Sequence, residues 1–268
     1  MLTDFFAYDF LTRALIAGLL VAIVAPVLGM FLTVRRYSLI ADTLSHASLA
    51  GVGIGMLLGI NPVWTAIGVA VLVAIGIERL RSNGSLSGES VLALFLSGSL
   101  AFAVVAMSAA KTFNGGVLSY LFGSITTVSP QDLWIIGGLT VITLGIIAKL
   151  FRSLFLMSFD EDIARANGLP VTAHSLLLAI LTAATVAVSM RVVGILLIGA
   201  LMIIPVLAAT QWKQGFKTTM GIAVIISILS VLCGLAISYR FDLATGGTIV
   251  LCAISAFIIS LVGRRFVK

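Results

Sequence analysis

Charged side chains are scarce in this 268-residue sequence. Asp, Glu, Lys and Arg make up 10% of it, whereas hydrophobic residues make up 60%. A soluble domain carries roughly 25% charged residues, so the chain lacks the polar surface that a soluble protein of this length needs. Its mean hydropathy is +1.23, and its apolar runs are continuous rather than alternating with a period of two, which favours membrane-spanning helices over a β-barrel. We therefore expect an all-α, multi-pass protein of the cell membrane.

Catalytic motifs are missing as well. No G-x-x-x-x-G-K-[ST] sequence occurs, so the chain has no phosphate-binding loop with which to hydrolyse ATP. The sequence contains only two His residues and no H-E-x-x-H motif, and no G-x-S-x-G occurs at a convincing strand–turn–helix boundary. We predict that this chain is not itself an enzyme and holds no resident cofactor.

Cysteine and clustered positive charge are the remaining absences. The two cysteines, Cys233 and Cys252, lie in apolar runs without a C-x-x-C pair, so no redox or thiolate-metal motif is present and we expect two small buried residues. The net charge is +6, but the basic residues are scattered between apolar runs. No basic patch indicates a nucleic-acid partner. The first apolar run lacks a basic n-region, so we expect no cleavable signal peptide.

Nine apolar stretches have about the length of 20 residues that a bilayer-spanning helix needs. They are residues 14–34, 38–60, 62–78, 89–110, 133–151, 172–190, 192–210, 218–238 and 244–263. The shorter apolar stretch 116–128 is interpreted as re-entrant or interfacial. Because no linker, low-complexity tract or clear repeat interrupts the sequence, we expect a single transmembrane domain over residues 1–268.

The basic residues predict the orientation. With the N-terminus outside and the C-terminus cytoplasmic, twelve of them fall on the inner face and four on the outer face, as expected from the enrichment of Lys and Arg in cytoplasmic loops. The outer four are Arg13, Lys111, Arg191 and Arg240. If 116–128 were a full span, the distribution would become ten against six, which is why nine spans are preferred. Arg191 is interpreted as a topological anchor, and His174 as a solvated interfacial residue.

Two ionisable residues interrupt the second predicted span. Asp42 and His46 are four residues apart, so they share one helix face with their Cβ atoms about 6 Å apart. Ionisable residues are costly inside a bilayer and mark function by default. Carboxylate oxygen and neutral imidazole are both zinc ligands, and imidazole also suits other first-row metals. We predict a metal site at Asp42 and His46; the alternative is a hydrogen bond between them that holds helices together.

Small residues accompany this pair. Ala50 and Gly53 continue the face of Asp42 and His46, and Ala47, Gly51 and Gly55 form a neighbouring ladder. Small faces let helices approach closely, so we expect the pair to face a close contact rather than lipid. One helix supplies only two ligands. A second copy across a two-fold axis would bring the number to four, which zinc prefers.

Two inner loops are candidates for docking a cytoplasmic partner, the alternative being ordinary connecting structure. In "SFDEDIARANGLP", Ser158 to Pro170, Ser158 and Glu161 have capping-box spacing and Gly168 suits the end of a short helix. In "PVLAATQWKQGFK", Pro205 to Lys217, a span is expected to end at residues 205–210 and turn back.

Four segments together resemble one known family. They are "DTLSHASLAG" (42–51), "LSYLFGSITTVSPQDL" (118–133), "RANGLP" (165–170) and "VVGILLIGALMIIPVLAAT" (192–210). In this order they are similar to the permease subunits of the ABC importers for zinc, manganese and iron. The resemblance implies two paired permeases, a separate cytoplasmic ATPase, an extracytoplasmic metal-binding protein, and metal in the transport pathway at Asp42 and His46. The first segment looks more like zinc importers than manganese importers, which more often have a proline soon after the His.

The resemblance also bears on coupling to the ATPase. Related vitamin and siderophore importers dock their ATPase at a loop corresponding to Pro205–Lys217, so the resemblance favours this loop over Ser158–Pro170. The coupling residues expected there are Pro205, Gln211, Lys213, Gly215 and Lys217. The competing function is a stand-alone secondary carrier or channel with Asp42 as a cation or proton relay. Such carriers often have broken helices at matching positions of two halves, and the sequence shows no such pair. An intramembrane scaffold or enzyme is a third and weaker hypothesis.

Overall fold

The computed structural model describes residues 9–82, 84, 86–110, 120–124 and 128–263, and all regular secondary structure in these ranges is helical. Eight helices are long and apolar enough to cross a membrane. They are α2 (Asp9–Val34), α3 (Leu39–Leu58), α4 (Pro62–Ser82), α5 (Gly88–Ala109), α7 (Pro130–Phe159), α9 (Val171–Val193), α11 (Phe216–Phe241) and α12 (Thr245–Gly263). The prediction of an all-α multi-pass membrane protein is confirmed.

The predicted span 192–210 forms a shorter helix. It is α10 (Ile195–Thr210), with 16 residues, and is therefore about 24 Å long, less than the bilayer's hydrocarbon core of about 30 Å. Gly194 separates it from α9 with a φ of 88°, in a turn that is buried in the protein. Pro205, expected where the span ends, lies buried inside α10, which continues to Thr210.

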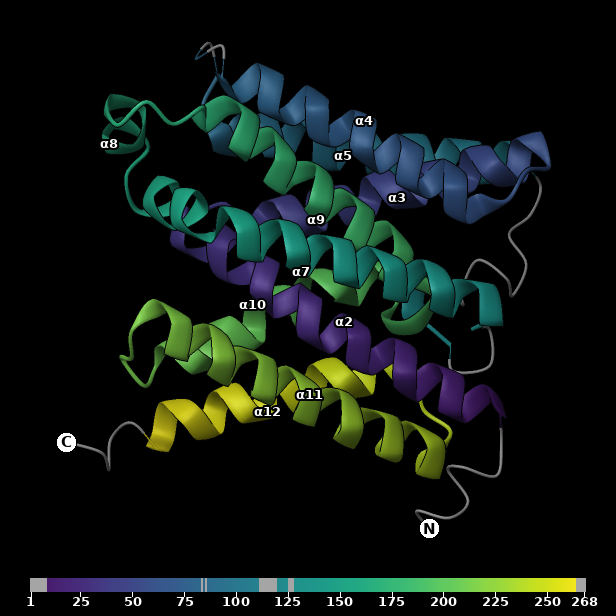
Figure 1. The fold of residues 1–268 in the computed structure, drawn as a ribbon. Helices are drawn as coiled ribbons and strands as arrows, with labels where there is room; N and C mark the ends of the chain where they lie inside the picture. The colour runs from purple at the N-terminus through teal and green to yellow at the C-terminus, as the bar shows by residue number, and fades with distance from the viewer. Residues whose placement is uncertain (1–8, 83, 85, 111–119, 125–127, 264–268) are drawn as a thin grey trace.

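The long helices run side by side through the bundle (Figure 1). Helices α3, α4 and α5 lie together on one side, α11 and α12 lie on the opposite side, and α2, α7, α9 and α10 lie between them. Helices α2, α3 and α9 are mostly buried, whereas α4, α5, α7, α11 and α12 bury only one stripe. We call the end of the bundle that carries α8 the inner end, and the opposite end the outer end.

The short helix predicted in the first inner loop is present as α8 (Glu161–Ala166), and Gly168 follows it with the expected positive φ of 77°. The predicted capping box of Ser158 and Glu161 is wrong. Extended Asp160 is the N-cap, and its Oδ1 accepts hydrogen bonds from two backbone N–H groups in the first turn, both 2.9 Å long. Ser158 still belongs to α7, where its hydroxyl donates to a backbone carbonyl.

Glycines bring α3 close to its neighbours, as predicted for this face. A Cβ at Gly51 would lie 2.6 Å from the Cα of Ala66 on α4, and one at Gly53 would lie 3.0 Å from the Cβ of Ala106 on α5. Such substitutions would push the helices apart, because interiors hold few voids. The small residues of α3 therefore serve contacts within this chain.

The cysteine prediction is wrong for Cys233, which is exposed on α11, and Cys252 on α12 is half-buried. Both helices lie at the periphery of the bundle. A thiol behaves as a small apolar group, so neither cysteine needs to be buried in the core.

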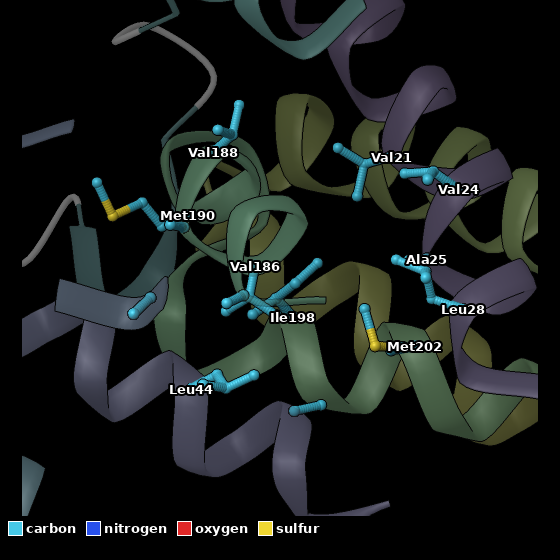
Figure 2. Close-up of a cluster of buried hydrophobic side chains, with 14 of the residues drawn as sticks. Val21, Val24, Ala25, Leu28, Leu44, Val186, Val188, Met190, Ile198 and Met202 are labelled. Carbon is cyan, nitrogen blue, oxygen red and sulfur yellow. The ribbon is translucent and has the colours of Figure 1, made fainter. Parts of the chain in front are cut away.

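The core between α2, α3, α9 and α10 is apolar and closely packed. Figure 2 shows Ile198 and Met202 of α10 between Leu44 of α3 and the side chains of α2. A Cβ at Gly29 of α2 would overlap the backbone carbonyl oxygen of Met202. The contact between α2 and α10 is thus backbone against backbone, with no side chain that could yield.

Gly29→Ala should therefore destabilise the protein, by about 1–3 kcal/mol, because the added methyl group must separate two buried helices. Gly138→Ala on α7 is the matched control, since nothing lies within 4 Å of its added Cβ and Ala favours a helix by about 1 kcal/mol over Gly. Thermal unfolding in detergent should show a lower Tm for the first variant and an unchanged or higher Tm for the second. Equal values for both would mean that α2 and α10 are not tightly packed.

Candidate metal site and its surroundings

Asp42 and His46 lie near the start of α3, which begins four residues after Arg35 and therefore at the inner end, where Arg35 binds Glu161 of α8. Asp42 is exposed in the single chain and His46 is half-buried. The Nδ1 atom of His46 is buried without a hydrogen-bond partner among the described residues. Leaving a polar atom buried and unpaired costs roughly 1–3 kcal/mol.

The alternative of an Asp42–His46 hydrogen bond does not match this geometry. No hydrogen bond or ion pair between the two side chains is present in the described part of the chain, and the unpaired Nδ1 atom leaves that nitrogen free. The two groups share a helix face, as their spacing predicted. They offer one oxygen and one nitrogen ligand to the same region.

Helix α10 sets the space around Asp42. A Cβ added at Gly199 would overlap Oδ1 of Asp42, so only glycine at this position lets the carboxylate lie directly against α10. Sequence reasoning missed Gly199. The only signal was a glycine within an apolar helix, which alone does not identify a partner.

One chain does not complete a coordination shell. No group of three or more His, Cys, Asp or Glu side chains that could hold a metal ion occurs among the described residues. If a zinc ion is bound by Asp42 and His46, one chain provides only two of the four ligands that zinc prefers. Because Asp42 is exposed, further ligands can reach it from water or from another chain.

A network of charged residues lies at the inner end. Arg35, directly after α2, donates to Glu161 Oε1 on α8 (2.5 Å) and to Ser175 Oγ on α9 (2.6 Å). Arg81 of α4 donates to the same two partners at 3.2 Å and 2.9 Å, and pairs with Glu78 at 3.3 Å. Arg165 of α8 itself also lies 3.9 Å from Glu161. Three cations and two anions thus join α8 to the ends of α2 and α4 and to α9.

Glu161 is the hub of this inner network. Partial burial acts to raise the pKa of its carboxyl, but the hydrogen bond from Arg35 and the charges of Arg81 and Arg35 outweigh burial and lower the pKa. In the sequence, Arg35 and Arg81 counted only among the twelve basic residues predicted for the inner face. Arg81 has a local partner in Glu78, but the partner that both arginines share, Glu161, lies in another element, 126 and 80 residues away. No local spacing reveals that pairing.

A second network lies at the outer end. Arg191 donates to Asp132 Oδ2 at 2.7 Å, and its guanidinium lies 5.8 Å from the ring centroid of Tyr120. Asp132 is buried and also completes the capping box of α7 with Ser129. The topological anchor predicted at Arg191 is therefore an ion pair that ties α9 to α7.

Residues 120–124 pack against the turn between α9 and α10. The N–H of Ser124 donates to the carbonyl of Arg191 at 3.2 Å, and a Cβ at Gly123 would lie 2.6 Å from the carbonyl oxygen of Val192. The stretch 116–128, predicted to be re-entrant or interfacial, lies otherwise largely outside the described residues. Its described residues 120–124 cover the buried turn at Gly194, which separates α9 from α10.

The predicted coupling residues separate into three environments. Gln211, Lys213 and Gly215 lie in the turn between α10 and α11, at the inner end, with Lys213 and Gly215 exposed. Pro205 is buried in α10. Lys217 is in the first turn of α11, with its Nζ 5.1 Å above the ring centroid of Phe151.

His174 is half-buried at the start of α9, as expected of an interfacial residue, with its Nδ1 3.0 Å from the carbonyl of Pro170.

Comparison with known proteins places these features in a family. The model of the ABC 3 transport family matches residues 7–264. The chain is 31% identical to the high-affinity zinc uptake system membrane protein ZnuB of Haemophilus influenzae, covering 96% of this chain and 99% of that one. It is 34% identical to the manganese import system permease protein ScaB of Streptococcus parasanguinis, covering 97% and 94%. The solved structure of PsaBC from Streptococcus pneumoniae in complex with Fab superimposes with a TM-score of 0.86 at 32% identity, covering 97% of this chain and 95% of that one.

Glu161→Gln should loosen α8, because neutralising this carboxyl leaves Arg35 without its acidic partner. For a partly exposed ion pair with charged hydrogen bonds we expect about 1–2 kcal/mol of lost local stability, or roughly five- to thirtyfold faster hydrogen exchange in residues 160–169 at neutral pH. Asp162→Asn, in the same turn but outside the network, should leave the exchange unchanged. Equal protection in both variants would show that the network does not hold α8.

The stability that Glu161 contributes to α8 depends on pH in a defined direction. Because the pKa of Glu161 is lowered in the folded protein, its contribution is complete above the ordinary value of about 4.5 and is lost as the pH falls through the lower folded value. Exchange in 160–169, corrected for its intrinsic pH dependence, should therefore be constant from pH 8 to pH 5 and rise only at lower pH. A rise centred near pH 6 or above would contradict this assignment.

Proposed function

This chain belongs to the ABC 3 transport family, and we propose that it is the membrane-spanning permease subunit of an ATP-driven importer of divalent transition-metal ions. The observation that carries the proposal is the pair on α3: a carboxylate lying against Gly199 and, one turn later, an imidazole nitrogen that is buried without a partner. Structural side chains in a membrane are expected to satisfy one another. This pair instead offers free ligand atoms.

The metal site is completed by a second permease in this proposal. Two copies facing each other would bring two carboxylates and two imidazoles together, and the exposure of Asp42 in the single chain leaves one side of the site open for such a copy. The incomplete ligand set within one chain supports this arrangement. The second permease is proposed to be identical.

The proposed cycle uses these residues as a site of alternating access. An extracytoplasmic metal-binding protein delivers the ion at the outer end, and Asp42 and His46 bind it with neutral imidazole, since a protonated nitrogen cannot ligate. ATP hydrolysis by a separate cytoplasmic subunit then opens the site to the inner end. In this orientation the N-terminus is outside and α8 faces the cytoplasm.

Zinc is the proposed substrate, with manganese or iron as the alternatives. One oxygen and one nitrogen from each copy suit the tetrahedral preference of zinc, whereas harder ions favour all-oxygen sites with more ligands. Relatives of similar identity are named for zinc and for manganese, so their names do not decide between them. The competing class, a stand-alone carrier, is disfavoured because these relatives are named as parts of uptake and import systems.

Coupling to the ATPase is proposed at the turn between α10 and α11, with Lys213 and Gly215 exposed. This turn directly continues α10, whose Gly199 contacts Asp42, so a push at the turn would reach the metal site along one helix. The structure also offers the other inner loop for this contact, because α8 is braced by the network of charged residues at the inner end and exposes Ile163.

Metal uptake by the assembled transporter tests the site. Asp42→Asn and His46→Gln should each reduce uptake by roughly tenfold or more, because outer-shell changes alone typically cost 10–100-fold in metal affinity. Asp242→Asn and His174→Gln make the same chemical changes outside the site and should leave uptake near wild type. Wild-type uptake by both site variants would show that Asp42 and His46 only pack helices.

Copurification with the ATPase tests the coupling surface. Lys213→Glu, or a bulky insertion next to Gly215, should reduce the amount of bound ATPase several-fold, because both disturb the proposed contact. Ile163→Asp in α8 is the comparison. If Ile163→Asp releases the ATPase while the changes at the α10–α11 turn do not, the coupling contact is α8 and the proposal for the turn is wrong.

A further inference from the structure

Two adjoining hollows run along the side of the bundle at the inner end, between α7 and α11. The first has a volume of about 490 Å³ and the second, which reaches α2, has a volume of about 620 Å³. Both are lined by Phe151, Arg152 and Lys217. Together they form one elongated feature, which we call the α7–α11 groove.

Three exposed cations line this groove: Lys149 and Arg152 of α7 and Lys217 of α11. No acidic residue lines either hollow, and none of the three forms a salt bridge within the described residues, where Lys217 only lies over the ring of Phe151. Arg35 and Arg81 at the same end of the bundle are matched by two glutamates. The positive charge of the groove is therefore left unneutralised by the described part of this chain.

The rest of the groove is apolar. Its wall toward the bundle centre is formed by Val27, Leu144, Ile147 and Met220. At the inner end the rings of Phe31, Phe151 and Phe155 lie 5.1–5.9 Å from the ring of Phe216. All three rings contact Phe216, so the base of the hollow is a packed aromatic cluster.

The groove opens toward the lipid-facing side of the bundle. The exposed face of α7 carries large apolar side chains over its whole length, with Trp134, Val141 and Phe159 exposed by 84%, 71% and 62%. Lys149 precedes the end of α7 by ten residues, or about 15 Å, so its charge lies near the boundary of the hydrocarbon core. A cation at this depth extends toward the head groups.

We propose that the α7–α11 groove binds an anionic phospholipid of the inner leaflet. The phosphate lies between Arg152 and Lys217, with Lys149 beside it, and an acyl chain follows Val27, Leu144, Ile147 and Met220. Charge complementarity selects this occupant, because unpaired cations beside an apolar channel at the membrane boundary match an acidic head group joined to a hydrocarbon chain. The proposal requires membrane insertion but not metal transport.

Native mass spectrometry of the purified permease with added phosphatidylglycerol tests the site. The variant Arg152→Gln/Lys217→Gln removes the two cations shared by both hollows. Since each basic side chain near an anionic surface contributes roughly fivefold, the affinity for phosphatidylglycerol should fall by roughly tenfold or more. Arg36→Gln/Arg79→Gln removes two exposed charges outside the groove and should not change it.

Two further experiments test whether the ligand needs both an acidic head group and an acyl chain. Zwitterionic phosphatidylcholine should bind weakly to all forms, and glycerol 3-phosphate, which lacks the acyl chains, should not compete. Ala148→Trp, which fills the apolar part and keeps every charge, should also lower retention of phosphatidylglycerol. Equal retention by wild type and the groove variants would overturn the proposal. So would loss of the permease dimer, with unchanged lipid retention, in Arg152→Gln/Lys217→Gln, since the groove would then be an interface between copies.

Discussion

Close contacts at glycines of α10 and its neighbours are the constraint on which the packing of the bundle centre depends. A Cβ at Gly199 would overlap the Asp42 carboxylate, so this side chain alone lies between α3 and α10 at that point. On another side of α10, a Cβ at Gly29 of α2 would overlap the backbone carbonyl oxygen of Met202. The short central helix thus contacts both neighbours closely, and its position limits the space around the carboxylate.

The length of α10 creates a second constraint. A helix of 16 residues leaves part of the bilayer to irregular backbone, which lipid does not tolerate because unpaired N–H and C=O groups cannot be solvated there. The chain meets this constraint by burying the turn at Gly194 under residues 120–124 and the start of α12, where a Cβ at Gly246 would overlap the carbonyl oxygen of Val193. The φ and ψ of 88° and 149° at Gly194 belong to a region that other residues rarely adopt.

Charged residues serve two different purposes in this bundle: some are paired and fix helices, and others are unpaired and line the α7–α11 groove. Helix α9 is fixed at its outer end by the pair of Arg191 and Asp132 and near its inner end by Ser175, within a network in which every arginine is paired with Glu78 or Glu161. Lys149, Arg152 and Lys217 form no salt bridge within the described residues. Their positive charge is gathered where the groove meets lipid, which is where an external anion can neutralise it.

The sequence predicted the features that local patterns determine. Hydropathy predicted the helices, the i, i+4 spacing predicted that Asp42 and His46 share a face, and the positive φ of Gly168 followed from its place after a short helix. The Ser158 cap failed because Asp160 offered the same kind of hydrogen bond two residues closer to the helix. Gly199, the partners of Arg35 and the α7–α11 groove were not predictable, since each depends on segments that meet only in three dimensions.

X-ray absorption at the zinc edge, on the purified permease loaded with zinc, tests the proposed metal site most directly, because it reports the ligand atoms themselves. We predict one zinc ion for two chains, bound only by nitrogen and oxygen at about 2.0–2.2 Å, with scattering from two imidazole rings. Sulfur at about 2.3 Å, or an ion bound without imidazole, would place the metal away from Asp42 and His46 and contradict this assignment.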